Sequence, residues 1–165
     1  MFDTFYSFRY VNSSSKNIKG QFVKEHKLTF CCNRGHQYIV NVEQYEYHLF
    51  AIKFYLKAHR FSQNKYKLLT NHHNIPPIIR TCVEIMLYFL KHNPYASFCF
   101  VGENSFEESV AETKRFKVYK RVMENHFSPL SFWHLIDTNR SFYLLQNKLS
   151  NTPEKMEDLI HSLLS

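Results

Sequence analysis

The segment from Ile78 to His92 constrains the fold of this chain more than any other, because apolar residues occupy nearly every side of a helix there. The preceding residues, Asn74 to Pro77, form a helix-start pattern, since proline is tolerated in the first turn, where backbone amides lack partners. Arg80 and Glu84 are four residues apart on the one polar stripe, a spacing that lets opposite charges pair. We expect this helix to be the most buried element of the fold.

The part of the chain before residue 59 has the pattern of β-strands, in which aromatic and aliphatic residues recur at a spacing of two. Turn signals at Gly20 and at Asn33–Gly35 separate these segments. Successive strands with short links predict an antiparallel meander. The expected strands are Thr4–Val11, Gln21–Phe30, Gln37–Tyr47 and His48–Ala58, although the last could instead extend the third.

Strands and helices alternate in the second half of the chain. Ser105–Glu108 has the spacing of a capping box, so a helix could begin there and continue to Phe127, with an interruption near Thr113. Thr152 and the proline after it start a final helix with an aliphatic stripe, which packs on its own sheet or engages another protein. The remaining segments are a short strand and a hairpin, namely Ala96–Val101, Phe132–Ile136 and Ser141–Gln146.

Together these elements predict an α+β fold. It consists of an antiparallel β meander packed by one buried central helix, a basic amphipathic helix, a β hairpin and a C-terminal helix. The sequence shows no repeat, linker or low-complexity tract, so we expect one domain over residues 1–165.

The chain carries a net charge of +7, from 21 basic and 14 acidic residues. A charge of this size and sign favours acidic partners, although it says nothing about the fold. Aromatic residues reach 17%, which is typical of an AT-rich genome when Asn, Lys and Ile are also abundant. The aromatic excess therefore has an explanation that requires no binding surface, and an aromatic binding surface is the alternative.

Signatures of catalysis and of metal binding are weak. Only three glycines are present, so glycine-rich nucleotide loops and a nucleophile elbow have no counterpart. Cys31, Cys32 and His36 offer three metal ligands without a second paired motif, and we expect no metal and no cofactor. The cysteine spacing does not indicate disulfides, no signal peptide is expected, and the longest apolar run is too short to cross a bilayer. We expect a cytoplasmic protein without enzymatic activity or membrane contact.

The first basic cluster lies between residues 114 and 121, where no acidic residue occurs. On a helix, Lys114, Lys117 and Arg121 would share one stripe, which would leave a cationic ridge in solvent suited to phosphates. The alternative is that glutamates early in the helix and cations late in it complement the macrodipole. The cluster comprises Lys114, Arg115, Lys117, Lys120 and Arg121, and the opposite side would carry Phe116, Tyr119, Met123 and Phe127.

The second basic cluster belongs to a longer stretch, Tyr47–Val83, that contains no acidic residue. Tyr55, Phe61 and Tyr66 are interleaved with its cations, as in proteins that stack the bases of single-stranded RNA. The alternative is a solvated strand edge, where lysine discourages edge pairing. The candidate binding residues of this cluster are Lys53, Lys57, Arg60, Lys65 and Lys67.

A metal-independent ribonuclease requires only a constellation of His, Lys, Arg or Tyr side chains, so the sequence leaves that alternative open. His59, Arg115 and Tyr119 would be its candidates, although no spacing argument supports them.

Three stretches within residues 45–147 carry a family resemblance. They are Lys53-Phe-Tyr-Leu-Lys57 with Asn64-Lys-Tyr-Lys-Leu-Leu-Thr70, then Ile79-Arg-Thr-Cys-Val83, and finally Gly102-Glu-Asn-Ser105 with Thr113-Lys-Arg-Phe-Lys-Val-Tyr119. They resemble a group of small bacterial proteins often found on mobile elements, a group that implies no activity and no site residues. Within that setting, the size, the AT-rich composition and the basic character are similar to those of an anti-CRISPR protein that inhibits the type VI-B RNA-guided ribonuclease.

This resemblance implies a non-enzymatic inhibitor that acts on the effector and its guide RNA. The expected partner is RNA or an RNA-loaded effector protein, bound through the basic surfaces. Two alternatives come from other classes of protein. One is an RNA-binding protein or a metal-independent ribonuclease toxin from a mobile element, and the other is an adaptor that binds only protein.

Overall fold

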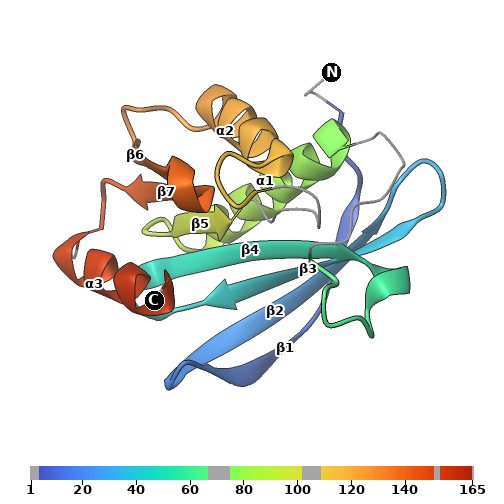
Figure 1. The fold of residues 1–165 in the computed structure, drawn as a ribbon, viewed down its shortest axis with the longest axis horizontal. Coiled ribbons are helices and arrows are strands. Elements are labelled where there is room, and N and C mark those ends of the chain that lie inside the picture. The colour runs from blue at the N-terminus through green and yellow to red at the C-terminus, as the bar shows by residue number, and fades with distance from the viewer. Residues whose placement is uncertain (1–3, 67–74, 102–108, 151–152, 165) are drawn as a thin grey trace.

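The computed structural model describes residues 4–66, 75–101, 109–150 and 153–164 (Figure 1). These residues form a seven-stranded sheet and three α-helices, which confirms the expected α+β class. In chain order the elements are β1 (Phe8–Ile18), β2 (Gln21–Cys31), β3 (Gln37–Gln44), β4 (Leu49–Leu56), α1 (Ile75–His92), β5 (Ser97–Val101), α2 (Lys114–His126), β6 (Phe132–Asp137), β7 (Phe142–Asn147) and α3 (Pro153–Leu164), with short 3-10 turns η1 (Glu46–His48), η2 (Lys57–His59) and η3 (Thr138–Arg140).

The strands lie in the order β1-β2-β3-β4-β5-β7-β6, and every neighbouring pair is antiparallel except β4 and β5. The first four strands form the predicted meander. The parallel step is brief, because only Leu49–Ala51 of β4 pairs with Ser97–Cys99 of β5. Beyond those three residues the two strands diverge, and α1 connects them (Figure 1).

Helices cover both faces of the sheet. Phe98 of β5 and Tyr143 of β7 belong to the core that α1 and α2 complete, whereas Cys99 and Phe142 belong to a second core completed by α3. Neighbouring residues on a strand point to opposite faces. Consequently α1 and α2 pack on one face and α3 packs on the other, at one end of the sheet (Figure 1).

Helix α1 begins where the two prolines predict, and the N–O distance of its Arg80–Glu84 pair is 2.6 Å. The expectation that it is the most buried element is wrong. Several of its residues are only partly buried, and its last turn, Lys91–His92, is exposed. Strand β7 is instead buried at every position, because it lies between the two helical layers.

The first strand differs from the prediction of Thr4–Val11, since β1 runs from Phe8 to Ile18. It is an edge strand, and most of its residues are exposed, including the polar run Asn12–Asn17. Such a strand needs no apolar alternation, so periodicity could not detect it. Lys19 and Gly20, both with positive φ, form the two-residue turn into β2.

The segment around Tyr47 separates β3 from β4, so the fourth strand does not extend the third. Tyr47 and His48 adopt φ values of 60° and 59°, and the Tyr45 amide donates to the Leu49 carbonyl at 2.7 Å across the turn. The chain therefore reverses here, and β4 pairs antiparallel with β3 from Phe50 to Leu56.

The later elements agree with the predicted hairpin and C-terminal helix. Strands β6 and β7 pair antiparallel, and the Asp137 side chain accepts hydrogen bonds from the amides of Asn139 and Arg140 in the turn. Helix α2 begins at Lys114, which agrees with an interruption near Thr113. The capping-box residues Ser105–Glu108 lie outside the described residues, as does Thr152.

Asn147 connects the end of β7 to the start of β5. Its amide nitrogen Nδ2 donates to the carbonyls of Pro94 and Ala96 at 2.7 and 3.0 Å, and its backbone amide donates to Ser97 Oγ at 2.9 Å. Within the described part of the chain, no helix combines the length and apolar character needed to span a bilayer.

The stripe of α3 packs on its own sheet, since Met156, Leu159 and Ile160 are buried beside Leu144. Replacing Met156, which has no exposed surface, with alanine would leave a cavity between helix and sheet. We expect Met156→Ala to lower the free energy of unfolding by about 2–4 kcal/mol in urea titrations. The exposed neighbour Lys155 provides the control, and Lys155→Ala should change that free energy by less than about 0.5 kcal/mol. Equal effects would contradict this packing.

Candidate nucleic-acid interface

Helix α2 has the amphipathic arrangement that the sequence predicts. Thr113 caps its N-terminus, because the hydroxyl oxygen accepts a hydrogen bond from the Phe116 amide at 3.1 Å. The side chains predicted for the inner face are buried, namely Phe116, Tyr119, Met123 and Phe127. Four of the five predicted cations are exposed, namely Lys114, Lys117, Lys120 and Arg121. We call these four residues the α2 ridge.

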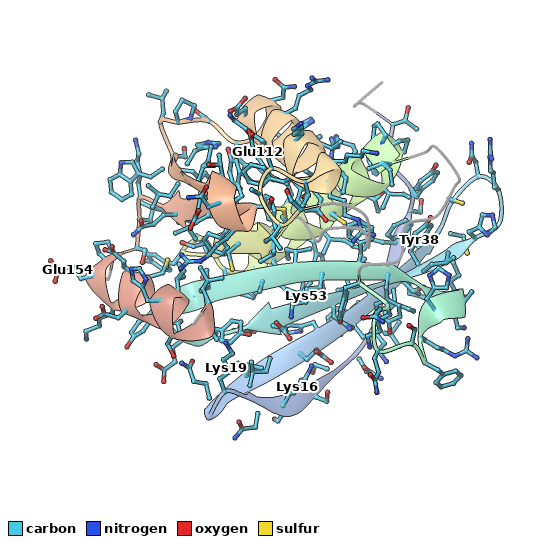
Figure 2. The ribbon with its side chains drawn as sticks, viewed as in Figure 1. Lys16, Lys19, Tyr38, Lys53, Glu112 and Glu154 are labelled. Carbon is cyan, nitrogen blue, oxygen red and sulfur yellow. The ribbon has the colours of Figure 1, made fainter. Side chains whose placement is uncertain are left out.

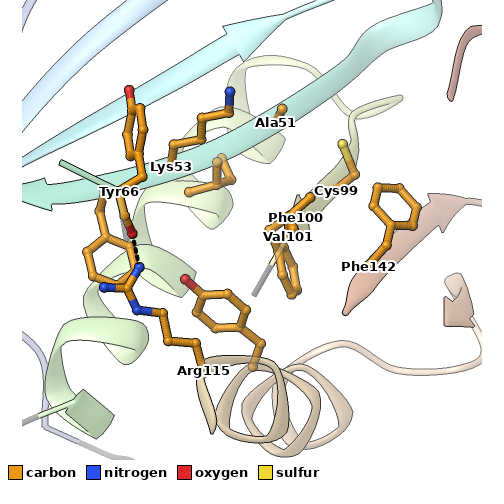
Figure 3. Close-up of a pocket in the computed structure, with 11 residues that line it drawn as sticks. Ala51, Lys53, Tyr66, Cys99, Phe100, Val101, Arg115 and Phe142 are labelled. Carbon is orange, nitrogen blue, oxygen red and sulfur yellow. Dashed lines mark hydrogen bonds between the residues drawn. The ribbon is translucent and has the colours of Figure 1, made fainter. Parts of the chain in front are cut away.

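Arg115 is not part of the α2 ridge, because its residue surface is only 7% exposed. Its guanidinium donates to the backbone carbonyl of Tyr66 and lies over the Phe54 ring at 5.4 Å (Figure 3). The helical spacing contained this signal, since Arg115, Tyr119 and Val122 share the buried side of α2. Arg115 thus joins α2 to the segment that follows β4.

The observed bounds of α2 contradict the alternative explanation, in which early glutamates and late cations complement the helix macrodipole. No acidic residue lies in the first turn, and Glu112 precedes the helix with a φ of 47°. Lys114 lies in the first turn, where the dipole favours anions, and Lys117, Lys120 and Arg121 lie in the turns after it, where the dipole has little effect. Its charges also repel one another at three- and four-residue spacings, such as Lys117 with Lys120 and Arg121.

The second cluster occupies β4 and the segment after it, and its four described cations already have partners. Lys53 lies on the sheet face opposite α1 and α2, where it pairs with Glu43. Lys57 donates a hydrogen bond to the Gln37 side chain at 3.2 Å, and Arg60 donates one to the Lys57 carbonyl at 3.2 Å. Lys65 lies over the rings of Tyr55 and Tyr66 at 4.5 and 5.3 Å. Lys67, also predicted here, lies outside the described residues.

The charge of Lys53 is balanced in space although no acid lies near it in the sequence. Glu43 on the neighbouring strand is 2% exposed, and its carboxylate lies 3.2 Å from Lys53 Nζ and 3.7 Å from Lys16 Nζ. Lys16 also contacts Glu25 at 3.1 Å, and Tyr45 donates its hydroxyl to Glu43 at 3.1 Å. Figure 2 labels Lys16 and Lys53, the two lysines of this network. No local sequence pattern indicates this network, because its members come from four separate segments.

The three aromatic residues of the second cluster differ in what they offer a ligand. Tyr55 is buried. Burial raises the pKa of Tyr66 to about 12, so the Tyr66 phenol stays neutral, and its oxygen accepts a hydrogen bond from Asn41 Nδ2 at 2.9 Å. Phe61 is 87% exposed and lies under the Arg60 guanidinium at 4.5 Å. Of the three predicted stacking residues, Phe61 is the one with an open ring.

A cleft of about 130 Å³ opens where β4 and β5 diverge (Figure 3). Lys53 and Tyr66 lie on one side of it, and Arg115 approaches from α2. Tyr119, also of α2, is another lining residue. The two basic clusters therefore meet at this cleft, although they lie on different layers of the fold. His59, the third ribonuclease candidate, is not among the residues that line it.

Burial makes two of the cysteine thiols, Cys82 and Cys99, poor nucleophiles. All four are free thiols, and burial raises the pKa of both Cys82 and Cys99 to about 12. Among the described side chains, no group of three His, Cys, Asp or Glu residues is arranged to hold a metal ion. Comparison with protein-family models, with curated proteins and with solved structures finds no match to this chain.

The contrast between Arg115 and Lys117 can be tested by stability measurements. Arg115→Ala removes a buried guanidinium and leaves the Tyr66 carbonyl without its donor, so we expect a loss of about 2–4 kcal/mol of unfolding free energy. Lys117→Ala removes an exposed side chain and should change that free energy by less than about 0.5 kcal/mol. Urea unfolding of both variants measures the difference, and a tolerated Arg115→Ala would contradict the inward orientation.

Thiol reactivity provides a second test of the buried layers. At pH 8, Ellman's reagent should modify Cys31 rapidly and the other three cysteines only after unfolding, because Cys31 alone is exposed. Rapid modification of two or more native thiols would contradict the described packing.

The buried thiols also predict how stability depends on pH. Because burial raises the pKa of Cys82 and Cys99, the unfolded chain, with a thiol pKa near 9.0, loses these protons at a lower pH than the folded chain does. The free energy of unfolding should therefore fall as the pH rises from 9.0 toward 12.

Proposed function

We propose that this chain is a non-enzymatic binding protein whose α2 ridge contacts the phosphates of RNA. The observation that carries the proposal is the set of exposed cations on α2. Among the described side chains, no carboxylate forms an ion pair with Lys117, Lys120 or Arg121. A surface with paired charges would have less to offer a polyanion.

The energetic balance of α2 supports this proposal. Like charges three and four residues apart destabilise a helix by about 0.2–0.5 kcal/mol per pair, and cations near its N-terminus oppose the macrodipole. A bound phosphate would reverse both effects, because it neutralises the cations and interacts favourably with the positive end of the dipole. The arrangement is thus unfavourable for the free helix and favourable for an anion complex.

The second cluster has a smaller part in the proposal. Lys53 is paired with Glu43, and Lys65 lies on tyrosine rings, so neither charge is as available as those of α2. Arg60 and Phe61 form an exposed cation-and-ring pair that can stack on a base. We propose that α2 supplies the phosphate contacts and that this pair supplies a base contact.

The partner that we propose is the RNA-loaded effector of a type VI-B system, with this chain as a stoichiometric inhibitor. The family resemblance supports this identity, and the α2 ridge supports contact with the guide RNA or with the effector's RNA-bound surface. An inhibitor of this kind requires no catalytic group of its own. The ribonuclease alternative receives less support, because Arg115 and Tyr119 are buried and already engaged in packing.

Binding of labelled single-stranded RNA at several salt concentrations tests the phosphate contacts. We expect the affinity to fall as salt rises, with a slope in the log–log plot of about −0.7 for each phosphate contact. The double variant Lys117→Ala/Arg121→Ala should weaken binding and reduce that slope by about 1.4. Lys155→Ala on α3 is the matched control, because it removes one exposed cation from another helix. Binding that is independent of salt, or equally weakened by the control, would contradict the proposal.

The same samples separate the binding protein from the ribonuclease toxin. RNA that stays intact after prolonged incubation supports a non-enzymatic role, and cleavage by the purified chain would overturn it. For the inhibitor identity, we expect one equivalent of the chain to suppress RNA cleavage by a guide-loaded type VI-B effector. The double α2 variant should then require a large excess. Full effector activity in the presence of excess chain would overturn that identity.

A further inference from the structure

We propose that two copies of this chain associate through the β6 edge and form one continuous sheet. Strand β6 is the outermost strand on its side of the sheet, and it exposes three large apolar side chains. Trp133, Leu135 and Ile136 are 46%, 48% and 40% exposed. An apolar edge strand is a template for pairing with another strand. This inference does not depend on the proposed RNA contacts.

The opposite edge of the sheet is protected against such pairing. Strand β1 carries the polar run Asn12–Asn17, with an exposed lysine at residue 16, and its register shifts between Tyr10 and Asn12. Polar and charged residues and irregular registers are the features by which natural sheets prevent edge-to-edge association. Within the described residues, the two edges of the sheet therefore differ, because β6 lacks the polar run and the register shift of β1.

The sequence of β6 is complementary to itself in an antiparallel pair. A two-fold axis perpendicular to the sheet keeps each face of the sheet on the same side in both copies. When His134 lies beside His134 of the second copy, Trp133 lies opposite Leu135 of the second copy, and the reverse contact forms at the other side of the axis. Aromatic and aliphatic cross-strand pairs of this kind stabilise a sheet.

The His134 side chain does not obstruct this axis, because the fold holds it inward. Its Nε2 atom lies 2.9 Å from the Phe127 carbonyl, which can only accept, so Nε2 carries the proton. Nδ1 then accepts from the Tyr143 hydroxyl at 2.5 Å. Both ring nitrogens are satisfied within one chain.

A groove beside β6 fits the tryptophan of the second copy. It has a volume of about 460 Å³ and lies between the β6–β7 hairpin and α3, with Leu135, Leu144 and Ile160 in its lining. Leu135 and Leu144 are register partners on the face that α3 covers. Trp133 of the second copy, opposite Leu135, would project along the same face and into this groove. Each copy would thus supply one projecting ring and one groove.

The charges at the two ends of β6 also match in an antiparallel pair. Lys148 Nζ donates to the Pro129 carbonyl at 2.6 Å and lies 5.4 Å from the centre of the Trp133 ring at the start of the strand. Asp137 ends the strand with a partly exposed carboxylate that pairs with Arg140 at 3.0 Å. Antiparallel pairing brings Asp137 of one copy toward Lys148 of the other. This complementarity favours a second copy of this chain over an unrelated strand as the occupant of the edge.

Sedimentation equilibrium of the full chain tests the proposal. We expect the wild-type protein to reach twice its chain mass of 19.9 kDa as the concentration rises. Leu135→Lys puts a charge at the centre of the edge and should give a monomer with unchanged circular dichroism. Val11→Lys is the matched control, because it adds the same charge at a 40% exposed position of β1, and it should remain dimeric.

Trp133 is the single tryptophan of the chain, so its fluorescence reports on the same contact. We expect its emission maximum to shift to shorter wavelength as the wild-type protein associates, and to stay constant for Leu135→Lys. A wild-type protein that stays monomeric at 100-fold dilution and at the highest soluble concentration would overturn the proposal. A dimer that survives Leu135→Lys, or that is lost in Val11→Lys, would overturn it as well.

Discussion

The brief parallel contact between β4 and β5 is the constraint on which the rest of this fold depends. Three residue pairs join the β1–β4 meander to the β5–β7–β6 half of the sheet. Because parallel neighbours require a crossover, α1 must pass over one face, and α2 then packs beside it. The divergence of the two strands beyond Ala51 and Cys99 opens the cleft toward which Arg115 and Lys53 converge. Asn147 holds the start of β5 in position for this contact.

Among the described residues, Lys16 and Lys53 pair with carboxylates, whereas no ion pair involves Lys117, Lys120 or Arg121. On the sheet face opposite α1 and α2, Glu43 is buried between Lys16 and Lys53, which satisfies a carboxylate that would otherwise be costly to bury. On α2, the exposed cations repel one another, and Lys114 in the first turn opposes the helix dipole. The first arrangement stabilises the free protein, and under our proposal a bound anion would relieve the repulsion in the second. This difference is why our proposal rests on α2 rather than on the longer acid-free stretch.

Local sequence patterns predicted the helices and strands whose buried residues recur at a regular spacing. The predictions failed where a structural feature depends on contacts between distant segments. The prolines before Ile78 and the apolar runs around Phe98 and Leu144 indicated α1, β5 and the hairpin correctly. Strand β1 was misplaced because an exposed edge strand is defined by backbone pairing with β2 and not by its side chains. The pairing of Lys53 with Glu43 required the β3–β4 register, which no single segment contains. Arg115 could have been separated from the α2 ridge by its helical spacing alone.

Hydrogen–deuterium exchange of the chain alone and in complex with a guide-loaded type VI-B effector tests the central claim most directly. The claim is that the α2 ridge forms the contact and that the fold itself does not change. We predict slower exchange in the peptides that cover residues 114–121 and 57–66, with the β1 edge and α3 unchanged. Protection confined to α3 or to β1, with exchange in α2 unaffected, would contradict the claim.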